Sequence, residues 1–259
     1  MRCVLNRFLA RTCLLVFALA AFGSANAQDF QGIYVGAYAG GNPSHSDAHT
    51  FTVFSPTGYF ATTSPPAIAT VGNQKIDPSG FSGGGTFGFN LQHHAFVYGA
   101  EMDFGSMSMS SSATGTATYP CCAPTAFTVT QTVSTDWLFT GRGRIGVAVS
   151  KVLFYGTGGL AATNLNYKAL FTDTFATAHE NAGIEQKRKG WIAGGGVELR
   201  LTKHWSVKGE FLHADFGQEQ VTSTNLTAFT PPIPFPSNIF THNADLTSNI
   251  FRGGLNFRF

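Results

Sequence analysis

Aromatic and aliphatic residues alternate with small or polar residues in eight separate segments of the chain. In the last segment, Phe251, Leu255 and Phe259 share one face, whereas Arg252 and Arg258 lie on the other. An alternation with a period of two predicts β-strands rather than helices. The eight predicted strands span 32–41, 80–91, 95–107, 133–149, 152–167, 189–201, 205–217 and 246–259; in 152–167 the pattern does not assign the two faces.

The segments between the predicted strands are alternately long and short. The short links are 92–94, 150–151 and 202–204, and the long polar segments 42–79, 108–130, 168–188 and 218–245 contain all eleven prolines. Proline is excluded from strands that cross lipid, because it cannot donate a ladder hydrogen bond. An even strand number with alternating long and short links is typical of outer-membrane barrels. We therefore predict an all-β fold, an eight-stranded antiparallel transmembrane β-barrel with four long extracellular loops and three short periplasmic turns.

The N-terminal segment has a different composition from the rest of the chain. Three arginines precede an apolar run at 14–22, and Ala25 and Ala27 form an A-x-A cleavage site. This is the pattern of a cleaved secretory signal peptide. The prediction is a signal peptide at 1–27 and a barrel domain at 28–259, exported to the bacterial outer membrane. No segment after residue 27 approaches the roughly 18 apolar residues of a membrane-spanning helix.

Removal of the signal peptide changes the charge of the protein. The full chain has 16 Lys and Arg against 14 Asp and Glu, and the first 27 residues include three of the arginines. The mature chain of 259 − 27 = 232 residues then has 13 basic against 14 acidic side chains, a net charge of −1. Its composition therefore predicts no nucleic-acid partner.

Ten charged residues on the predicted strands lie on the face opposite the aromatic side chains. On the lipid-facing side each Lys or Arg would cost about 2–4 kcal/mol near the membrane centre. In a lumen as narrow as that of an eight-stranded barrel, buried charges have to be paired. We predict a packed ion-pair network, with a narrow polar pore for small solutes as the alternative. Its members are Glu101, Asp103, Arg142, Arg144, Glu198, Arg200, Lys208, Glu210, Arg252 and Arg258.

Histidine and cysteine give no sign of a catalytic, metal or cofactor site. No predicted strand brings Ser, His and an acid together as a nucleophilic triad requires. Six histidines lie in predicted loops or turns without the spacing of metal ligands, so we expect them to be solvated. They are His45, His49, His179 and His242 in the loops, and His93 and His94 in a turn. The adjacent Cys121 and Cys122 are interpreted as a pair of loop cysteines or a local vicinal disulfide rather than a redox or metal site. We expect no cofactor and no enzymatic activity.

The stretch 194–217 resembles a known hairpin. It is similar to the penultimate hairpin of small alphaproteobacterial outer-membrane β-barrel proteins, often called outer-membrane immunogenic proteins. Phe211 and His213 stand where that family tends to have Tyr. The resemblance implies a barrel related to the OmpA-type membrane domain, a structural or surface-antigen role and no catalytic residues. The matching residues are Gly196, Val197, Glu198, Thr202, Trp205, Lys208, Glu210, Leu212, Asp215, Gly217 and Phe259.

The C-terminal residues indicate how such a barrel would be assembled. Phe257 and Phe259 end the chain in a pattern that resembles the assembly signal of bacterial outer-membrane barrels. We therefore expect the barrel-assembly machinery, outer-membrane lipid and lipopolysaccharide as partners, a monomeric state and no further domain after the last strand. The hypotheses for function are a structural, surface-exposed role in the cell envelope, a porin-like channel, or ligand or host binding through the loops.

Overall fold

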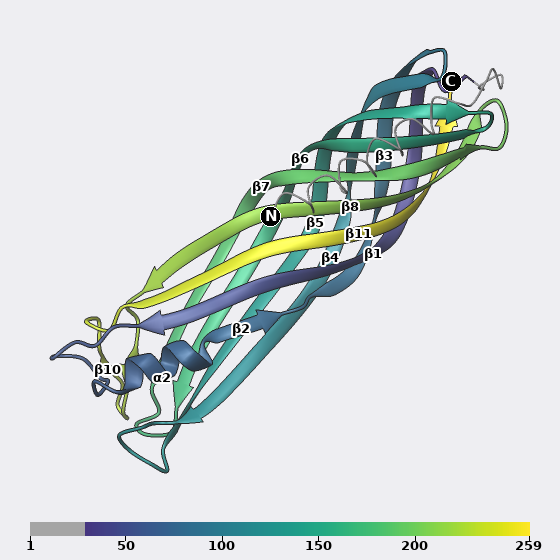
Figure 1. The fold of residues 1–259 in the computed structure, drawn as a ribbon. Coiled ribbons are helices and arrows are strands. Elements are labelled where there is room, and N and C mark those ends of the chain that lie inside the picture. The colour runs from purple at the N-terminus through teal and green to yellow at the C-terminus, as the bar shows by residue number, and fades with distance from the viewer. Residues whose placement is uncertain (1–28) are drawn as a thin grey trace, which may run out of the picture.

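Eight long antiparallel strands close into a barrel in the computed structural model, which describes residues 29–259. Each strand pairs with its neighbour along the chain, and the last strand pairs with the first, so the ring has no edge strand (Figure 1). The prediction of an eight-stranded barrel is confirmed. The strands are β1 (Gly32–Thr52), β3 (Ser79–His93), β4 (Phe96–Thr118), β5 (Ala126–Val149), β6 (Val152–Asp173), β7 (His179–Arg200), β8 (Trp205–Ser223) and β11 (Phe240–Arg258).

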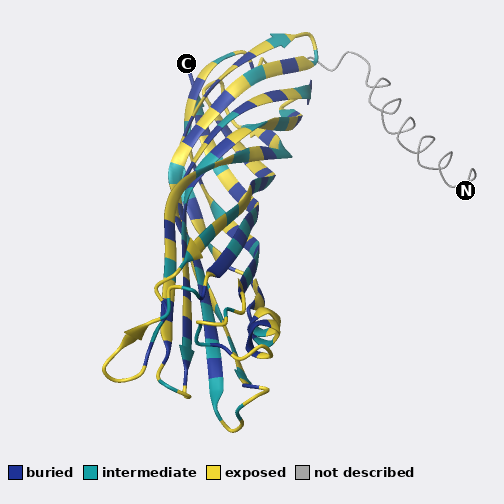
Figure 2. Cartoon of the chain, turned by 90° about the vertical axis from the view of Figure 1, so that its left-hand side faces the viewer, coloured by how far each residue is buried: buried dark blue, intermediate teal, exposed yellow. Residues whose placement is uncertain are grey.

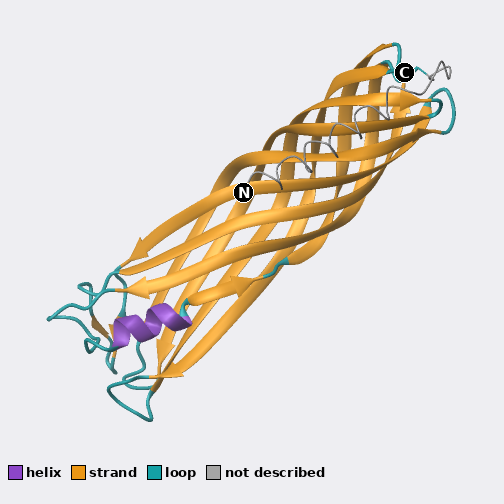
Figure 3. Ribbon diagram, in the orientation of Figure 1, coloured by secondary structure: helices purple, strands orange, loops and turns teal. Residues whose placement is uncertain are grey.

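The two ends of the barrel differ in their connections. One end, the turn end, has only short links between strands, and the other, the loop end, has four longer connections and all the short elements (Figure 3). These elements are α2 (Ser64–Val71), β2 (Asn73–Ile76), β9 (Thr227–Ala228) and β10 (Ile233–Pro234). The predicted signal peptide and its cleavage site at Ala25 and Ala27 lie outside the described residues.

No helix within residues 29–259 combines the length and the apolar character needed to cross a bilayer.

The strands extend much further toward the loop end than the hydrophobic pattern predicts. Most of the polar segment 108–130, predicted as a loop, forms the outer parts of β4 and β5. Hydroxyl groups pair across these two strands, at 2.7 Å for Ser112–Thr132, 3.0 Å for Thr114–Thr130 and 3.0 Å for Thr116–Thr128. Threonine is β-branched and suits a strand, but it adds nothing to an apolar alternation. The predicted loop boundaries are therefore wrong.

The prediction that every proline lies in a loop is also wrong. Pro43 lies inside β1, opposite Ser79 of β3, and Pro234 lies in the two-residue strand β10. In the ladder between β1 and β11, the paired positions skip from Gly41 to Ser44. The chain thus accommodates Pro43 where β1 makes no bridge to β11, which agrees with its missing N–H.

Two bulges change which side chains face the barrel interior. In β5 the register shifts between Ser134 and Leu138. In the part of β5 near the turn end the even-numbered residues face the interior, and in the part near the loop end the odd-numbered residues do. In β8 the shift lies near Gly217, which has φ +69° and thus a conformation that favours glycine. The β5 bulge is held by Asn164, whose side-chain oxygen accepts the Asp136 backbone N–H at 2.9 Å.

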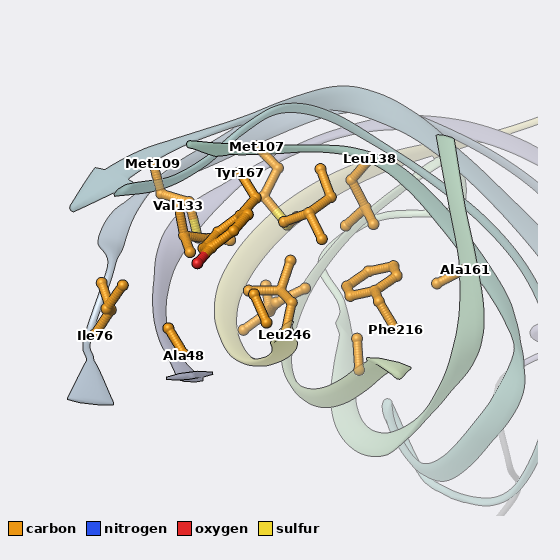
Figure 4. Packing of buried hydrophobic residues seen from close by; sticks show 14 of the residues in the cluster. Ala48, Ile76, Met107, Met109, Val133, Leu138, Ala161, Tyr167, Phe216 and Leu246 are labelled. Atoms are coloured by element: carbon orange, nitrogen blue, oxygen red, sulfur yellow. The ribbon is translucent and has the colours of Figure 1, made fainter. Parts of the chain in front are cut away.

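The barrel interior is mainly apolar near the loop end and mainly polar near the turn end. Tyr167, Phe216 and Leu246 belong to a buried cluster whose side chains point toward one another from different strands (Figure 4). A second apolar cluster, including Phe127 and Phe171, lies beyond it toward the loops. Buried and exposed residues alternate along most of each long strand (Figure 2). In β6, where the sequence left the facing open, the odd-numbered residues point inward.

Candidate functional site: the charged lumen

The charged residues of five strands meet inside the half of the barrel nearest the turn end. Three oppositely charged pairs lie directly opposite each other in the strand register: Glu101 and Arg142, Glu198 and Lys208, and Glu210 and Arg252. Closure of the barrel then brings β4 and β5 across from β8 and β11. Residues distant in sequence become neighbours because the lumen of an eight-stranded barrel is only wide enough for side chains.

The central cluster consists of Glu101, Asp103, Arg142, Lys208, Glu210 and Arg252. Arg142 contacts Glu101, and its guanidinium lies 2.7 Å from Asp103 and 3.5 Å from Glu210. Arg252 lies 2.7 Å from Asp103 and 2.8 Å from Glu210. Lys208 reaches Glu101 at 2.8 Å and Glu210 at 3.3 Å. Three acids and three bases give a net formal charge of 3 − 3 = 0, and every side chain is at most 2 % exposed.

A second group, the lower cluster, lies closer to the turn end and consists of Arg144, Glu198 and Arg258. Glu198 is 2.7 Å from Arg144 and 3.3 Å from Arg258, and it also accepts a hydrogen bond from Ser206 at 2.6 Å. Tyr34 joins the two clusters, since its hydroxyl donates to Glu101 at 2.8 Å and accepts from Arg144 at 2.8 Å. The charged side chains therefore form one continuous network.

Arg200 is the one predicted member that forms no salt bridge within residues 29–259. Its guanidinium donates to the backbone carbonyls of Thr202 at 3.2 Å and Lys203 at 2.6 Å. The alternation along β7 gives its face, but Arg200 is the last residue of that strand. The structure therefore places Arg200 at the rim of the barrel, where it holds the turn between β7 and β8, and its predicted place in the network is wrong.

Three buried tyrosines belong to the network and were not identified from the sequence. Besides Tyr34, Tyr155 donates to Glu210 at 2.8 Å and lies under Arg144, 4.0 Å from the guanidinium carbon to the ring centroid. Tyr38 lies similarly under Arg252 at 4.2 Å. The signal that points to two of them is glycine on the neighbouring strand, because Tyr34 lies opposite Gly88 and Tyr38 opposite Gly84. A side chain at position 88 would overlap the Tyr34 ring.

Phe30 closes the lumen at the turn end and was also missed. Its ring is fully buried with Val97, Ala148 and Leu153, and the Arg258 guanidinium lies 5.4 Å from its centroid. The backbone N–H of Phe30 donates to the Gln92 side chain at 2.6 Å. The apolar ring thus covers the lower cluster on the side that faces the turn end.

The carboxylates of the central cluster are fully engaged by structural donors. Asp103 accepts hydrogen bonds from Thr86 and Thr140 at 2.7 and 2.8 Å, in addition to the two arginines. Glu210 accepts from Tyr155 and Arg252, and Glu101 from Tyr34 and Lys208. A buried carboxylate is tolerated only when its lone pairs are satisfied in this way. The arrangement neutralises charge and fills the lumen.

The remaining candidate residues lie apart from this network. His242 is buried beside Glu180, 3.3 Å away, so its predicted solvation is wrong; it lies on the inner face of β11, which the polar sequence around it did not reveal. Cys121 and Cys122 form a vicinal disulfide in the loop between β4 and β5. At the C-terminus, the Phe257 ring packs against Trp205 at 5.1 Å and against Phe259 at 5.3 Å.

Comparison with known proteins assigns the fold to a family. The sequence profile of the family described as "Outer membrane protein beta-barrel domain" matches residues 12–259. The chain belongs to this outer-membrane β-barrel family. It is 27% identical over 190 residues to the 31 kDa outer-membrane immunogenic proteins of Brucella melitensis biotype 1 and Brucella suis biovar 1, which covers 73% of this chain and 70% of each relative. The family resemblance seen in the sequence is confirmed.

Solved outer-membrane proteins align with most of the chain at low sequence identity and low TM-score. OprG from Pseudomonas aeruginosa is 12% identical, with 88% of this chain and 96% of that chain covered and a TM-score of 0.42. The outer membrane protease OmpT from Escherichia coli is 8% identical, with 92% and 99% covered and a TM-score of 0.40.

Membership of this outer-membrane family orients the barrel. Outer-membrane barrels have short periplasmic turns and long extracellular loops, so the turn end is periplasmic and the loop end extracellular. Exposed apolar side chains form a band around the half nearest the turn end, with Trp191 and Phe251 at its extracellular edge and Trp205 and Phe259 at its periplasmic edge. Aromatic girdles of this kind mark the two membrane interfaces. The charge network therefore lies at membrane depth, and the apolar interior lies above the membrane.

Proposed function

We propose that this protein is a non-catalytic, non-conducting barrel that supports the outer membrane and presents its loops to the outside. The observation that carries the proposal is the central cluster, whose six side chains fill the lumen at membrane depth and are at most 2 % exposed. A conducting pore requires a continuous water-filled path, as in the wider barrels of porins. The closed hydrogen-bonded ring, with every strand paired on both sides, supplies the mechanical stability.

Planar-bilayer recording tests the proposal directly. Purified, refolded protein should give no discrete conductance steps, whereas steps that change with Arg142→Ala would favour a narrow channel. The matched control is Arg188→Ala, because Arg188 forms its ion pair with Glu219 on β8 above the charged lumen. Steps that occur equally in all three proteins and persist after further purification would also contradict the proposal.

The proposal includes assembly through the C-terminal strand. β11 pairs with β1 and β8 and therefore has to close the ring. We propose that Phe257 and Phe259 are recognised by the barrel-assembly machinery, and that the finished monomer contacts outer-membrane lipid and lipopolysaccharide. Support comes from the exposed residue Phe259, 74 % accessible, next to a strand edge that is free before closure.

Assembly can be measured by heat modifiability. A folded barrel migrates faster on a detergent gel without boiling than after boiling. Phe259→Ala should lower the folded fraction in cells without preventing refolding in detergent, since Phe259 lies outside the lumen network. The control is Phe175→Ala, an exposed phenylalanine at the extracellular end. Equal folded fractions for Phe259→Ala and wild type in cells would contradict the assembly proposal.

A further inference from the structure

A small cavity opens between three of the four extracellular loops. Its volume is about 190 Å³, and its walls are Tyr59 and Phe60 before α2, Tyr119 and the Cys121–Cys122 disulfide after β4, and Phe175 after β6. Pockets for drug-sized ligands have volumes of about 300–1,000 Å³. This cavity therefore has room only for a small group, and four of its eight lining residues are aromatic.

A buried carboxylate lies next to two of these aromatic walls. Asp173 Oδ2 accepts hydrogen bonds from the hydroxyls of Tyr59 at 2.6 Å and Tyr119 at 3.0 Å. Its Oδ1 accepts from the backbone N–H groups of Ala176 and Ala178, at 3.3 and 2.8 Å. Asp173 is only 9% exposed, and no Lys, Arg or His of residues 29–259 forms a salt bridge with it. A buried negative charge is normally paired with a positive one.

The hydroxyls of Tyr59 and Tyr119 are occupied by Asp173, so these residues offer their rings rather than free hydroxyls to the cavity. Burial, together with the hydrogen bond and the charge of Asp173, raises the pKa of both Tyr59 and Tyr119, so both stay neutral at physiological pH. The Tyr59 ring makes an angle of 76° with Phe60 at 5.2 Å and of 60° with Phe175 at 6.2 Å. The cavity is thus lined by neighbouring aromatic rings that are steeply inclined to one another.

We propose that this cavity binds a small, soluble, methylated ammonium cation such as choline. Aromatic faces attract quaternary ammonium groups through their quadrupoles, and a nearby carboxylate adds to that attraction. A neutral sugar would need free donors and acceptors, and the hydroxyls of Tyr59 and Tyr119 are already bound to Asp173. The cavity lies in the extracellular loops, away from the lipid-facing band, so the ligand would come from the medium.

The first experiment compares a cation with its neutral isostere. Calorimetric titration of protein refolded in octyl glucoside, a detergent without an ammonium group, would use choline, tetramethylammonium and 3,3-dimethylbutan-1-ol. We expect choline and tetramethylammonium to bind about tenfold more tightly than the neutral alcohol. Equal affinity for the alcohol, or no binding of either cation, would overturn the proposal.

Two variants separate charge from shape. Phe175→Leu keeps an apolar wall but removes its π face, so it should weaken choline binding about threefold to tenfold and leave the alcohol unaffected. Asp173→Asn should weaken binding of choline by at least as much, with folding checked by heat modifiability. The control is Phe229→Leu, since Phe229 touches Tyr59 with a centroid distance of 6.3 Å but does not line the cavity. Loss of choline and alcohol binding to the same degree in Phe175→Leu would contradict a cation site.

Discussion

The periplasmic and extracellular halves of the barrel are built from the same strands with opposite chemistry. On β8, the inward residues Ser206, Lys208 and Glu210 are followed on the same face by Leu212, Ala214 and Phe216. Outside, the lipid-facing Trp205, Val207 and Phe211 give way to His213 and Asp215. The polar and apolar faces thus exchange where the strand leaves the membrane.

This exchange shows that the surroundings of a strand, more than its backbone, decide which face is apolar. In the membrane the outside must be apolar and the lumen carries paired charges. Above it, water covers the outside and the interior becomes a mainly apolar core that also encloses the His242–Glu180 pair. The two halves should therefore respond differently to the same kind of substitution.

The largest expected effect comes from removing one charge of the central cluster. Arg142→Ala leaves Glu101, Asp103 and Glu210 with one cation fewer in a buried lumen. Breaking a buried ion pair in this way costs about 3–5 kcal/mol. Urea titration of the refolded protein, followed by heat modifiability, measures the change. Arg188→Ala, which removes a partly exposed pair above the charged lumen, should cost less than about 1 kcal/mol. Equal urea resistance of Arg142→Ala and wild type would show that the central cluster does not stabilise the barrel.

The same substitution at two depths on the outer face of β4 should reduce stability by different amounts. Met102 and Ser110 both point outward, but Met102 lies within the apolar band and Ser110 above it. Met102→Lys should cost about 2–4 kcal/mol near the membrane centre. Ser110→Lys should change stability by less than about 0.5 kcal/mol, as surface substitutions usually do. Refolding into phospholipid vesicles at increasing urea compares the two, and similar costs would mean that the membrane boundary is misplaced.

A smaller loss of stability is expected when a side chain is added at Gly88, in the space that the Tyr34 ring occupies. A methyl group at Gly88 would overlap the Tyr34 ring, whose hydroxyl joins the two charge clusters. Overpacking of this kind costs about 1–3 kcal/mol. Gly209→Ala is the matched control, because nothing lies within 4 Å of a methyl group there. Both variants would be unfolded in urea, and a Gly88→Ala variant as stable as Gly209→Ala would show that Tyr34 can move without cost.

The halves also differ in how far the sequence could predict them. Lipid forces a strict alternation, so the strands at membrane depth and the inward face of residues such as Arg142 and Glu210 followed from the period of two. Above the membrane, the outer face of the strands is formed by polar pairs such as Thr114 and Thr130, so the sequence there lacks the apolar alternation that predicts a strand. The extracellular strand halves, and with them the burial of His242, were therefore missed.

The position of a residue along its strand was the second feature that the sequence could not predict. Alternation gives the face of a residue but not its distance from the strand end, which is why Arg200 was placed in the network although it lies at the rim. Cross-barrel contacts, such as Arg142 with Glu210 and Lys208 with Glu101, depend on ring closure and register. A one-residue shift of register would exchange the two faces, and the sequence alone does not fix it.

The smallest expected effect is a pH dependence of the extracellular half. His45, on β1 above the membrane, has a raised pKa, chiefly because its ring hydrogen-bonds Asp77 at 2.6 Å, with Asp47 also 3.3 Å away. A raised pKa in the folded state means that protonated His45 stabilises the fold. This contribution is fully present below the unfolded-state pKa of about 6.5 and is lost as the pH rises through the higher folded-state value. Because the His45 side chain is 41% exposed, solvent screening limits the effect to a few tenths of a kcal/mol. Urea midpoints of wild type and His45→Gln should therefore differ slightly at pH 5.5 and coincide at pH 9, whereas a difference that grows with pH would contradict the assigned sign.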